Sequence, residues 1–298
     1  MDIDRQIGGK FEKIGQFRVG FCKIGPSVAE ELLLRNTANR GVKKGSVARF
    51  SRDMVAGNWR PTGEAIKFDT RGTLLDGQNR LIACVESRVD FWTLVILDVP
   101  AAAQEQMDSG ISRTTGDNLH LNGIANATLV SAIITLRWRY LNGISLQNAT
   151  PTHAEALELA DEETSASAKT VASNKPPRGA GNAAVAFVHY YGSKFSQERA
   201  DSFVTLLRSG AGLPYGCPIL TLRTSLAAGV WQGQPNWAKL SKIISVWNAW
   251  AEDREMKSLR LLSEFPSIVG GPQYSTKRLV VEAPPRVVRA YSPKVAQA

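Results

Sequence analysis

The hydrophobic positions in the first 115 residues change period several times, between helical spacing and strand-like alternation. The segments with helical spacing are residues 28–34 (with Ser27 as their N-cap), 46–57, 79–87 and a stretch that begins at Pro100. The expected strands span residues 65–69, 73–75 and 91–97. The last of these is almost continuously apolar, as is typical of a buried strand. Helices and strands that alternate at this spacing predict a compact mixed α/β unit.

Beyond about residue 115 the strand signals largely vanish and helical periodicity remains. The helices expected there span residues 126–140, 152–173, 183–191, 197–209, 218–232 and 236–250. The second of them begins with a capping box, Thr152 to Glu155. The sequence therefore predicts an α+β domain followed by an all-helical domain. Their expected limits are residues 1–117 and 118–270, with a basic, weakly ordered tail at 271–298.

Composition places the chain among globular proteins. It has 298 residues, of which 43% are hydrophobic. No apolar run is long enough to cross a bilayer, and the first residues lack the apolar core of a signal peptide. The three cysteines, Cys22, Cys84 and Cys217, lie far apart, which favours reduced thiols and argues against a zinc site. We therefore expect a cytoplasmic protein with no membrane partner; its oligomeric state cannot be predicted.

The formal net charge of +9 favours polyanionic partners. Residues 35–60 contain seven bases and one acid, and residues 277–298 contain five bases and one acid. The simpler interpretation is that these cations only solvate exposed faces, but two clusters on so basic a chain favour contact with DNA. The residues expected to make that contact are Arg40, Lys43, Lys44, Arg49 and Arg52.

The segment Asp76-Gly77-Gln78-Asn79-Arg80 has the features of an anion site. An apolar strand runs into an Asp-Gly turn, and a helix with unpaired N–H groups begins immediately afterwards. Arg80 in its first turn has a guanidinium suited to a forked phosphate contact, and Asp76 is suited to binding a metal ion or acting as a base. The alternative is an ordinary strand–turn–helix in which Asp76 caps the helix and Arg80 pairs with an acid. Both interpretations are open at this point.

The same five residues resemble the Asp-Gly-(Gln/His)-His-Arg signature of the ParB/sulfiredoxin superfamily. Residues 58–66 are similar to the Trp-Arg-x-x-Gly-Glu-x-Ile segment that precedes the signature in ParB-like chains of phages and actinobacteria. Residues 107–114 resemble the Asp-x-Gly-x-x-Arg-(Ser/Thr) stretch that follows it. The resemblance covers residues 20–117 and implies a small ParB/sulfiredoxin-like α/β fold.

The resemblance also implies a nucleotide site, with ATP or CTP and Mg²⁺ as cofactors. The residues it assigns to the nucleotide phosphates are Gly77, Gln78, Asn79, Arg80, Arg113 and Thr114, with Asp108 and Arg113 closing over the site. Asp76 would hold the metal ion, and Glu64 would join it as the catalytic general base, unless Glu64 pairs with Arg60 or Lys67 instead. The chain departs from the family at Asn79, where the signature has histidine, and the loop lacks the cysteine that sulfiredoxin chemistry needs.

The leading hypothesis is a nucleotide-binding, ParB-like protein associated with DNA, of phage or mobile-element origin. One alternative is an enzyme, a Mg²⁺-dependent kinase, nucleotide hydrolase or nuclease that acts on a small metabolite or on DNA. Another alternative is an adaptor in which the nucleotide site is vestigial, as the Asn79 replacement suggests. The sequence contains no Gly-x-x-x-x-Gly-Lys-(Ser/Thr) phosphate loop.

Overall fold

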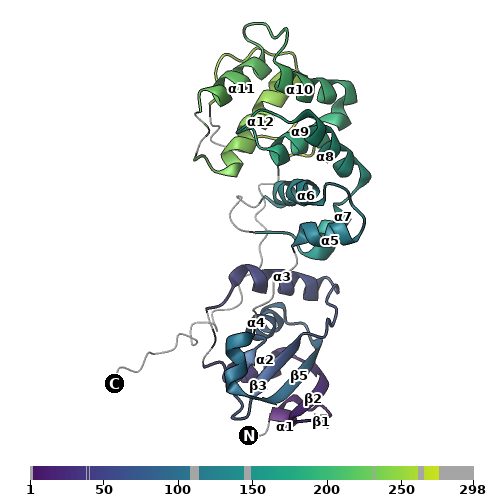
Figure 1. Cartoon of the computed structure of the whole chain (residues 1–298), viewed down its shortest axis with the longest axis vertical. Helices are drawn as coiled ribbons and strands as arrows, with labels where there is room; N and C mark the ends of the chain where they lie inside the picture. The colour runs from purple at the N-terminus through teal and green to yellow at the C-terminus, as the bar shows by residue number, and fades with distance from the viewer. Residues whose placement is uncertain are drawn as a thin grey trace, which may run out of the picture. The chain divides into compact units, whose positions relative to one another are not determined.

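A computed structural model describes residues 3–37, 39, 41–107, 114–143, 149–229, 231, 233–260 and 265–274. These residues form two compact units, one made by residues up to 107 and the other by residues from 114 onward. The first unit is drawn from purple to blue in Figure 1, and the second from teal to yellow. The described part of the chain is mixed α/β and mostly helical. No helix in it is both long enough and apolar enough to cross a bilayer.

The first unit is built on a mixed five-stranded sheet in the order β1-β2-β5-β3-β4. The strands are β1 (Glu12–Ile14), β2 (Phe17–Ile24), β3 (Ala65–Asp69), β4 (Leu74–Asp76) and β5 (Phe91–Val99). Strands β3 and β5 are parallel, and the other neighbouring pairs are antiparallel. The three strands expected from the sequence are confirmed. Strands β1 and β2 were not expected, although β2 lies beside β5 in the middle of the sheet.

The helices of the first unit differ in detail from those expected. They are α1 (Ile3–Ile7), α2 (Pro26–Leu33), α3 (Lys44–Val55), α4 (Gln78–Ser87) and the 3-10 helix η1 (Ala101–Gln106). Helix α2 has Gly25 as its N-cap and Pro26 in its first turn, so the prediction that Ser27 caps it was wrong. Proline fits the first helical position because its fixed φ is already helical and it has no N–H to satisfy. The stretch after Pro100 forms the 3-10 helix η1 instead of an α-helix.

One face of the sheet packs on these helices to form a core. Alternation along β2 and β5 directs Cys22, Ile24, Val95 and Leu97 to that face, where they join apolar side chains of all four α-helices of the unit. Residues of the opposite face, Phe21 among them, lie outside this core. In the part of the unit that the structure describes, the helical core lies on one face of the sheet, and the opposite face also carries apolar side chains.

The second unit has helices joined by loops, and no strand, in its described residues. It contains α5 (Thr115–Leu121), α6 (Ala127–Asn142), α7 (His153–Glu158), α8 (Glu162–Asn174), α9 (Asn182–Phe195), α10 (Gln197–Ser209), α11 (Pro218–Ala227) and α12 (Asn236–Ala251). The capping box at Thr152 and Glu155 is confirmed. The single helix expected over 152–173 is wrong: it divides into α7 and α8, because Asp161 caps a second helix start by accepting a hydrogen bond from the Thr164 N–H at 2.7 Å.

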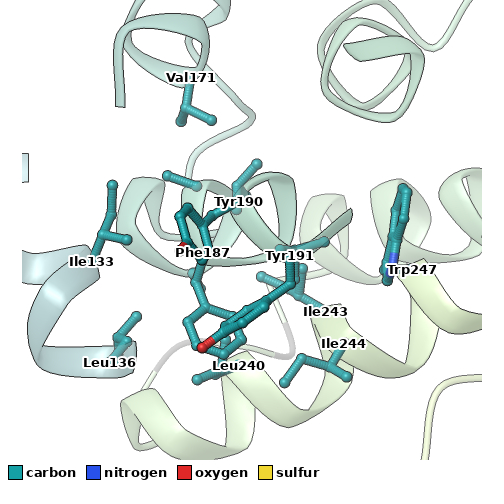
Figure 2. Packing of buried hydrophobic residues seen from close by; sticks show 14 of the residues in the cluster. Ile133, Leu136, Val171, Phe187, Tyr190, Tyr191, Leu240, Ile243, Ile244 and Trp247 are labelled. Carbon is teal, nitrogen blue, oxygen red and sulfur yellow. The ribbon is translucent and has the colours of Figure 1, made fainter. Parts of the chain in front are cut away.

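Helix α9 lies at the centre of the second unit and packs against α6, α8, α10 and α12. Its residues 184–192 are buried on every side of the helix, as expected of a central helix. Figure 2 shows Phe187 and Tyr191 of α9 beside Leu240, Ile243 and Ile244 of α12. Residues 275–298, which include most of the expected basic tail, lie outside the described residues.

Candidate functional site

The turn between β4 and α4 depends on a glycine. Asp76 ends β4, and Gly77 follows with φ of 106°, a value that favours glycine. A Cβ atom at Gly77 would lie 2.9 Å from Cγ1 of Ile66, so no larger residue fits without displacement. Gly77 is also the N-cap of α4, which has no side-chain cap. The alternative prediction that Asp76 caps this helix was therefore wrong.

Arg80 is turned inward, and its guanidinium is held by groups of the same unit. Its Nη1 donates to the Glu64 carbonyl oxygen at 2.6 Å, and its Nη2 donates to the Ala65 carbonyl oxygen at 2.8 Å. Nη2 also lies 3.5 Å from Oδ2 of Asp76, and Lys67 Nζ approaches the same oxygen at 3.1 Å. The ion pair expected from the strand–turn–helix interpretation is thus present. With its side chain only 11% exposed, Arg80 joins the start of α4 to the start of β3.

Gln78 and Asn79 attach a distant segment of the chain to the start of α4. Asn36 donates from Nδ2 to Oε1 of Gln78 at 3.0 Å, and the Lys43 N–H donates to Oδ1 of Asn79 at 3.3 Å. Asn39 strengthens the attachment with hydrogen bonds of 2.7 Å to Asn36 and to the β4 backbone. The basic segment that precedes α3 is therefore tied to the signature loop by side-chain amides.

This attachment places two of the predicted DNA contacts beside the predicted phosphate site. Lys43 and Lys44 are exposed at the N-terminal end of α3. Arg49 and Arg52 follow along the same helix and are half-buried, and Arg52 donates to the Ala48 carbonyl oxygen at 3.4 Å. Arg40, also predicted to contact DNA, lies outside the described residues.

The remaining candidates are less closely associated with the loop. Asp108 and Arg113 lie outside the described residues. Thr114 belongs to the second unit, where its hydroxyl forms a capping box with Asp117 at the start of α5. The Glu64 side chain is exposed, and only its backbone carbonyl contacts Arg80.

The groups around Asp76 do not resemble a Mg²⁺ ligand set. Its carboxylate is contacted by two cations, Lys67 and Arg80, which compete with a metal ion for the same oxygen. Over the described ranges, no three or more His, Cys, Asp or Glu side chains gather where a metal ion would be held. We therefore derive no metal-dependent step, and the catalytic and metal-binding roles of Asp76 and Glu64 stay predictions.

The structure also contains a Ser–His–Asp arrangement that the sequence did not indicate. In the second unit, the ring nitrogens of His189 lie 2.9 Å from Ser167 Oγ and 2.9 Å from Asp201 Oδ1. Ser167 and His189 are each only 2% exposed. A buried hydroxyl cannot reach a substrate carbonyl, so these residues join α8, α9 and α10 and do not form a hydrolase site.

Comparisons of the chain with protein-family models, with curated proteins and with solved structures give no match. The ParB/sulfiredoxin-like resemblance of residues 20–117 therefore stays a prediction. The functional argument depends on the geometry of the loop, in which residues 76–80 and the basic segment meet.

Proposed function

We propose that the first unit binds DNA through its phosphate groups, at the start of α4 and along the adjoining basic segment. The observation that carries the proposal is the contact between two features that are separate in the sequence. Asn79 accepts a hydrogen bond from the Lys43 N–H, so the basic segment with the exposed Lys43 and Lys44 lies against the half-buried Asn79 of the signature loop. Backbone N–H groups at helix starts and Lys or Arg side chains are the donors that proteins use to bind phosphate groups.

The electrostatics of the loop support an anionic ligand. The start of α4 carries the positive end of a ten-residue helix dipole, and no side chain caps it. The nearby carboxylate of Asp76 is offset by Lys67 and Arg80, so its charge does not repel a phosphate strongly. Lys43 and Lys44 then add two positive charges next to the helix end.

In this proposal the signature residues position the site, and the lysines bind the phosphates. Arg80 holds the loop against β3, while Gln78 and Asn79 hold the basic segment. The same donors suit the triphosphate of ATP or CTP, which would then compete with DNA. Nucleotide competition is therefore a second measurement on the same site.

The test is fluorescence anisotropy of a labelled DNA duplex between about 50 and 200 mM salt, the range over which phosphate contacts lose affinity. The double variant Lys43→Ala/Lys44→Ala removes two charges. The matched control, Lys10→Ala/Lys13→Ala, removes two exposed charges near β1, at the sheet edge opposite β4. Each lost phosphate contact reduces the slope of log affinity against log salt by about 0.9.

We expect the Lys43/Lys44 variant to lower that slope by about 1.8 and to weaken binding at low salt, while the control behaves as the wild type. Equal effects of the two variants would mean that binding follows net charge alone and that the site is elsewhere. Failure of the wild-type chain to bind duplex DNA at 50 mM salt would overturn the proposal. Displacement of DNA by millimolar ATP or CTP, lost in the Lys43/Lys44 variant, would assign the nucleotide to the same site.

A further inference from the structure

The open face of the sheet in the first unit carries a pair of exposed aromatic rings. Strand register sets Phe21 opposite Leu94 and Lys23 opposite Trp92, so all four side chains lie on the face that does not join the helical core. The rings of Phe21 and Trp92 are stacked, with centroids 5.2 Å apart and an interplanar angle of 12°. The two residues are 54% and 47% exposed.

Phe21 and Trp92 each leave about half of a large aromatic side chain exposed to water. Burial of apolar area stabilises folding, and an exposed stacked pair gives up much of that gain. A stacked pair beside a groove is a candidate interaction surface. The flat faces of the rings suit a planar ligand.

A groove extends from this aromatic pair. It has a volume of about 420 Å³, and its lining includes Trp59, Pro61 and Met54 besides Phe21 and Trp92. The indole N–H of Trp59 donates to the Trp92 carbonyl oxygen at 3.1 Å, which fixes one wall of the groove. The space is at the small end of ligand pockets, so it accommodates one or two planar rings but not a helix.

The charges beside the groove favour an anionic occupant. Lys23 pairs with the lining residue Asp90 at 2.9 Å. Arg60 is held at the groove by hydrogen bonds of 2.9 Å to the carbonyl oxygens of two lining residues. Arg88 is exposed next to the lining residue Val89.

The three cations Lys23, Arg60 and Arg88 therefore outnumber Asp90, the acidic residue in the lining. This balance disfavours the chain's own tail, residues 277–298, which carries five bases and one acid. Exposed aromatic rings combined with cations on an open sheet face match the chemistry that binds unpaired bases, by stacking on the base and attraction to its phosphate.

We propose that Phe21 and Trp92 stack on unpaired bases of single-stranded nucleic acid, with Arg60 and Arg88 attracting its phosphates. The inference rests on the proposed function for the choice of a polyanion, but it assigns a second surface with a different specificity. In duplex DNA the bases are paired and stacked on one another, so their flat faces cannot stack on Phe21 and Trp92. The aromatic surface therefore distinguishes single strands from duplex.

The experiment compares anisotropy of a labelled oligo-dT single strand and of a labelled duplex, at one salt concentration. The variants are Trp92→Ala, Phe21→Ala and the conservative Trp92→Phe, which keeps an aromatic face. Tyr215→Ala is the matched control, because Tyr215 is 83% exposed in the second unit. Circular dichroism verifies that each variant is folded.

We expect Trp92→Ala and Phe21→Ala to weaken single-strand binding by roughly 5- to 150-fold, the effect of losing one stacked base. Duplex binding should change less than about twofold, and Trp92→Phe should bind single strands nearly as the wild type does. Single-strand binding by Trp92→Ala equal to that of the Tyr215→Ala control would overturn the inference.

The Lys43→Ala/Lys44→Ala variant separates the two proposals. If it weakens duplex binding while the aromatic variants bind single strands normally, the proposed function stands and this inference fails. If the wild-type chain binds neither form, the proposed function fails and this inference fails with it.

Discussion

A buried arginine in the second unit allows a quantitative test of how its helices are held together. Arg137 on α6 is 5% exposed, and its guanidinium donates to the Leu159 carbonyl oxygen at 2.7 Å and to the Thr164 hydroxyl. Its Nη2 donates to the Tyr190 hydroxyl at 2.6 Å and lies 3.2 Å from Asp161 Oδ2. The ion pair therefore connects three elements, α6, the α7–α8 junction and α9.

The two members of this pair differ in their access to water. The Arg137 side chain is 7% exposed, whereas that of Asp161 is 38% exposed. Removal of Asp161 leaves a buried cation without its counterion, and it also removes the cap of α8. Removal of Arg137 leaves a carboxylate that water can still reach and that still caps the helix. The cost of breaking the pair should therefore depend on which member is removed.

Breaking a buried ion pair costs about 3–5 kcal/mol, and losing an N-cap costs about 1 kcal/mol. Because Asp161 is partly hydrated, we take the lower end and expect Asp161→Ala to reduce the free energy of unfolding by about 4 kcal/mol. Arg137→Met fills similar volume without charge, and we expect a loss of about 1–2 kcal/mol. The double variant removes the stranded cation, so it should be more stable than Asp161→Ala by about 1–2 kcal/mol.

Urea unfolding of the full chain, followed by tryptophan fluorescence, measures these differences, because five of the seven tryptophans lie in the second unit. The reasoning is refuted if the two single variants are equally destabilised, or if the double variant loses the sum of both effects. Additive losses would mean that Arg137 and Asp161 do not stabilise one another.

The pH dependence supplies a second measurement on the same pair. Burial acts to raise the pKa of Asp161, but hydrogen bonds from Thr164 and the charge of Arg137 lower it further than burial raises it. A carboxyl whose pKa is depressed on folding adds stability above its unfolded pKa of about 3.9, and that stability is lost as the pH falls through the lower folded value. The wild type should therefore lose more stability than Asp161→Ala between about pH 5 and pH 2.

Three further predictions follow from single contacts. Gly77→Ala should reduce the free energy of unfolding by about 1–3 kcal/mol in urea titration, because its Cβ would lie 2.9 Å from Ile66 at a positive φ. Burial raises the pKa of the Cys84 thiol to about 12, so an aromatic disulfide reagent at pH 8 should label it only after unfolding in urea. Ser167→Ala should reduce the free energy of unfolding by about 1–3 kcal/mol, because it leaves a buried ring nitrogen of His189 unpaired. Because Ser167 is buried, the wild-type protein should not cleave an activated ester.

The parts of the fold that were predictable are those in which the local pattern and the tertiary environment agree. Strand β5 is buried along its inward face, and the apolar run over residues 91–97 predicted a buried strand there. Strand β2 was missed because its pattern is ambiguous: Gly20 interrupts it, and Phe21 is apolar yet exposed. A sheet with one open aromatic face does not give the inward-apolar, outward-polar alternation from which strands are recognised.

The division of residues 152–173 was missed for a different reason. Residues Leu159 to Asp161 are compatible with a helix by local propensity, and apolar spacing continues across them. Helix α7 ends where the Leu159 carbonyl oxygen accepts a hydrogen bond from Arg137 and where Asp161 caps the next helix. The first is a contact between distant segments and the second is a side-chain hydrogen bond to the backbone. Neither can be read from the spacing of apolar residues.

The candidate site shows the same limit. The Asp-Gly turn and the start of α4 near Gly77 were predictable, because glycine at a strand–helix junction has a local conformational cause. Pairing of Arg80 with an acid was only one of two interpretations, since a guanidinium near a helix start can contact an external phosphate or a neighbouring carboxylate. The hydrogen bonds from Arg80 to the Glu64 and Ala65 carbonyl oxygens depend on the tertiary placement of β3, which the local pattern does not carry.

The inward position of the Arg80 guanidinium bears on what the resemblance in this loop implies. The ParB/sulfiredoxin-like signature, which stays a prediction for this chain, has histidine where this chain has Asn79. With Arg80 committed to backbone carbonyls, the asparagine has a different use, because its Oδ1 accepts the N–H of Lys43 and fixes the basic segment next to α4. Under the proposed function, the positive charge of the site comes from the exposed Lys43–Lys44 pair, which suits the phosphates of a polymer backbone.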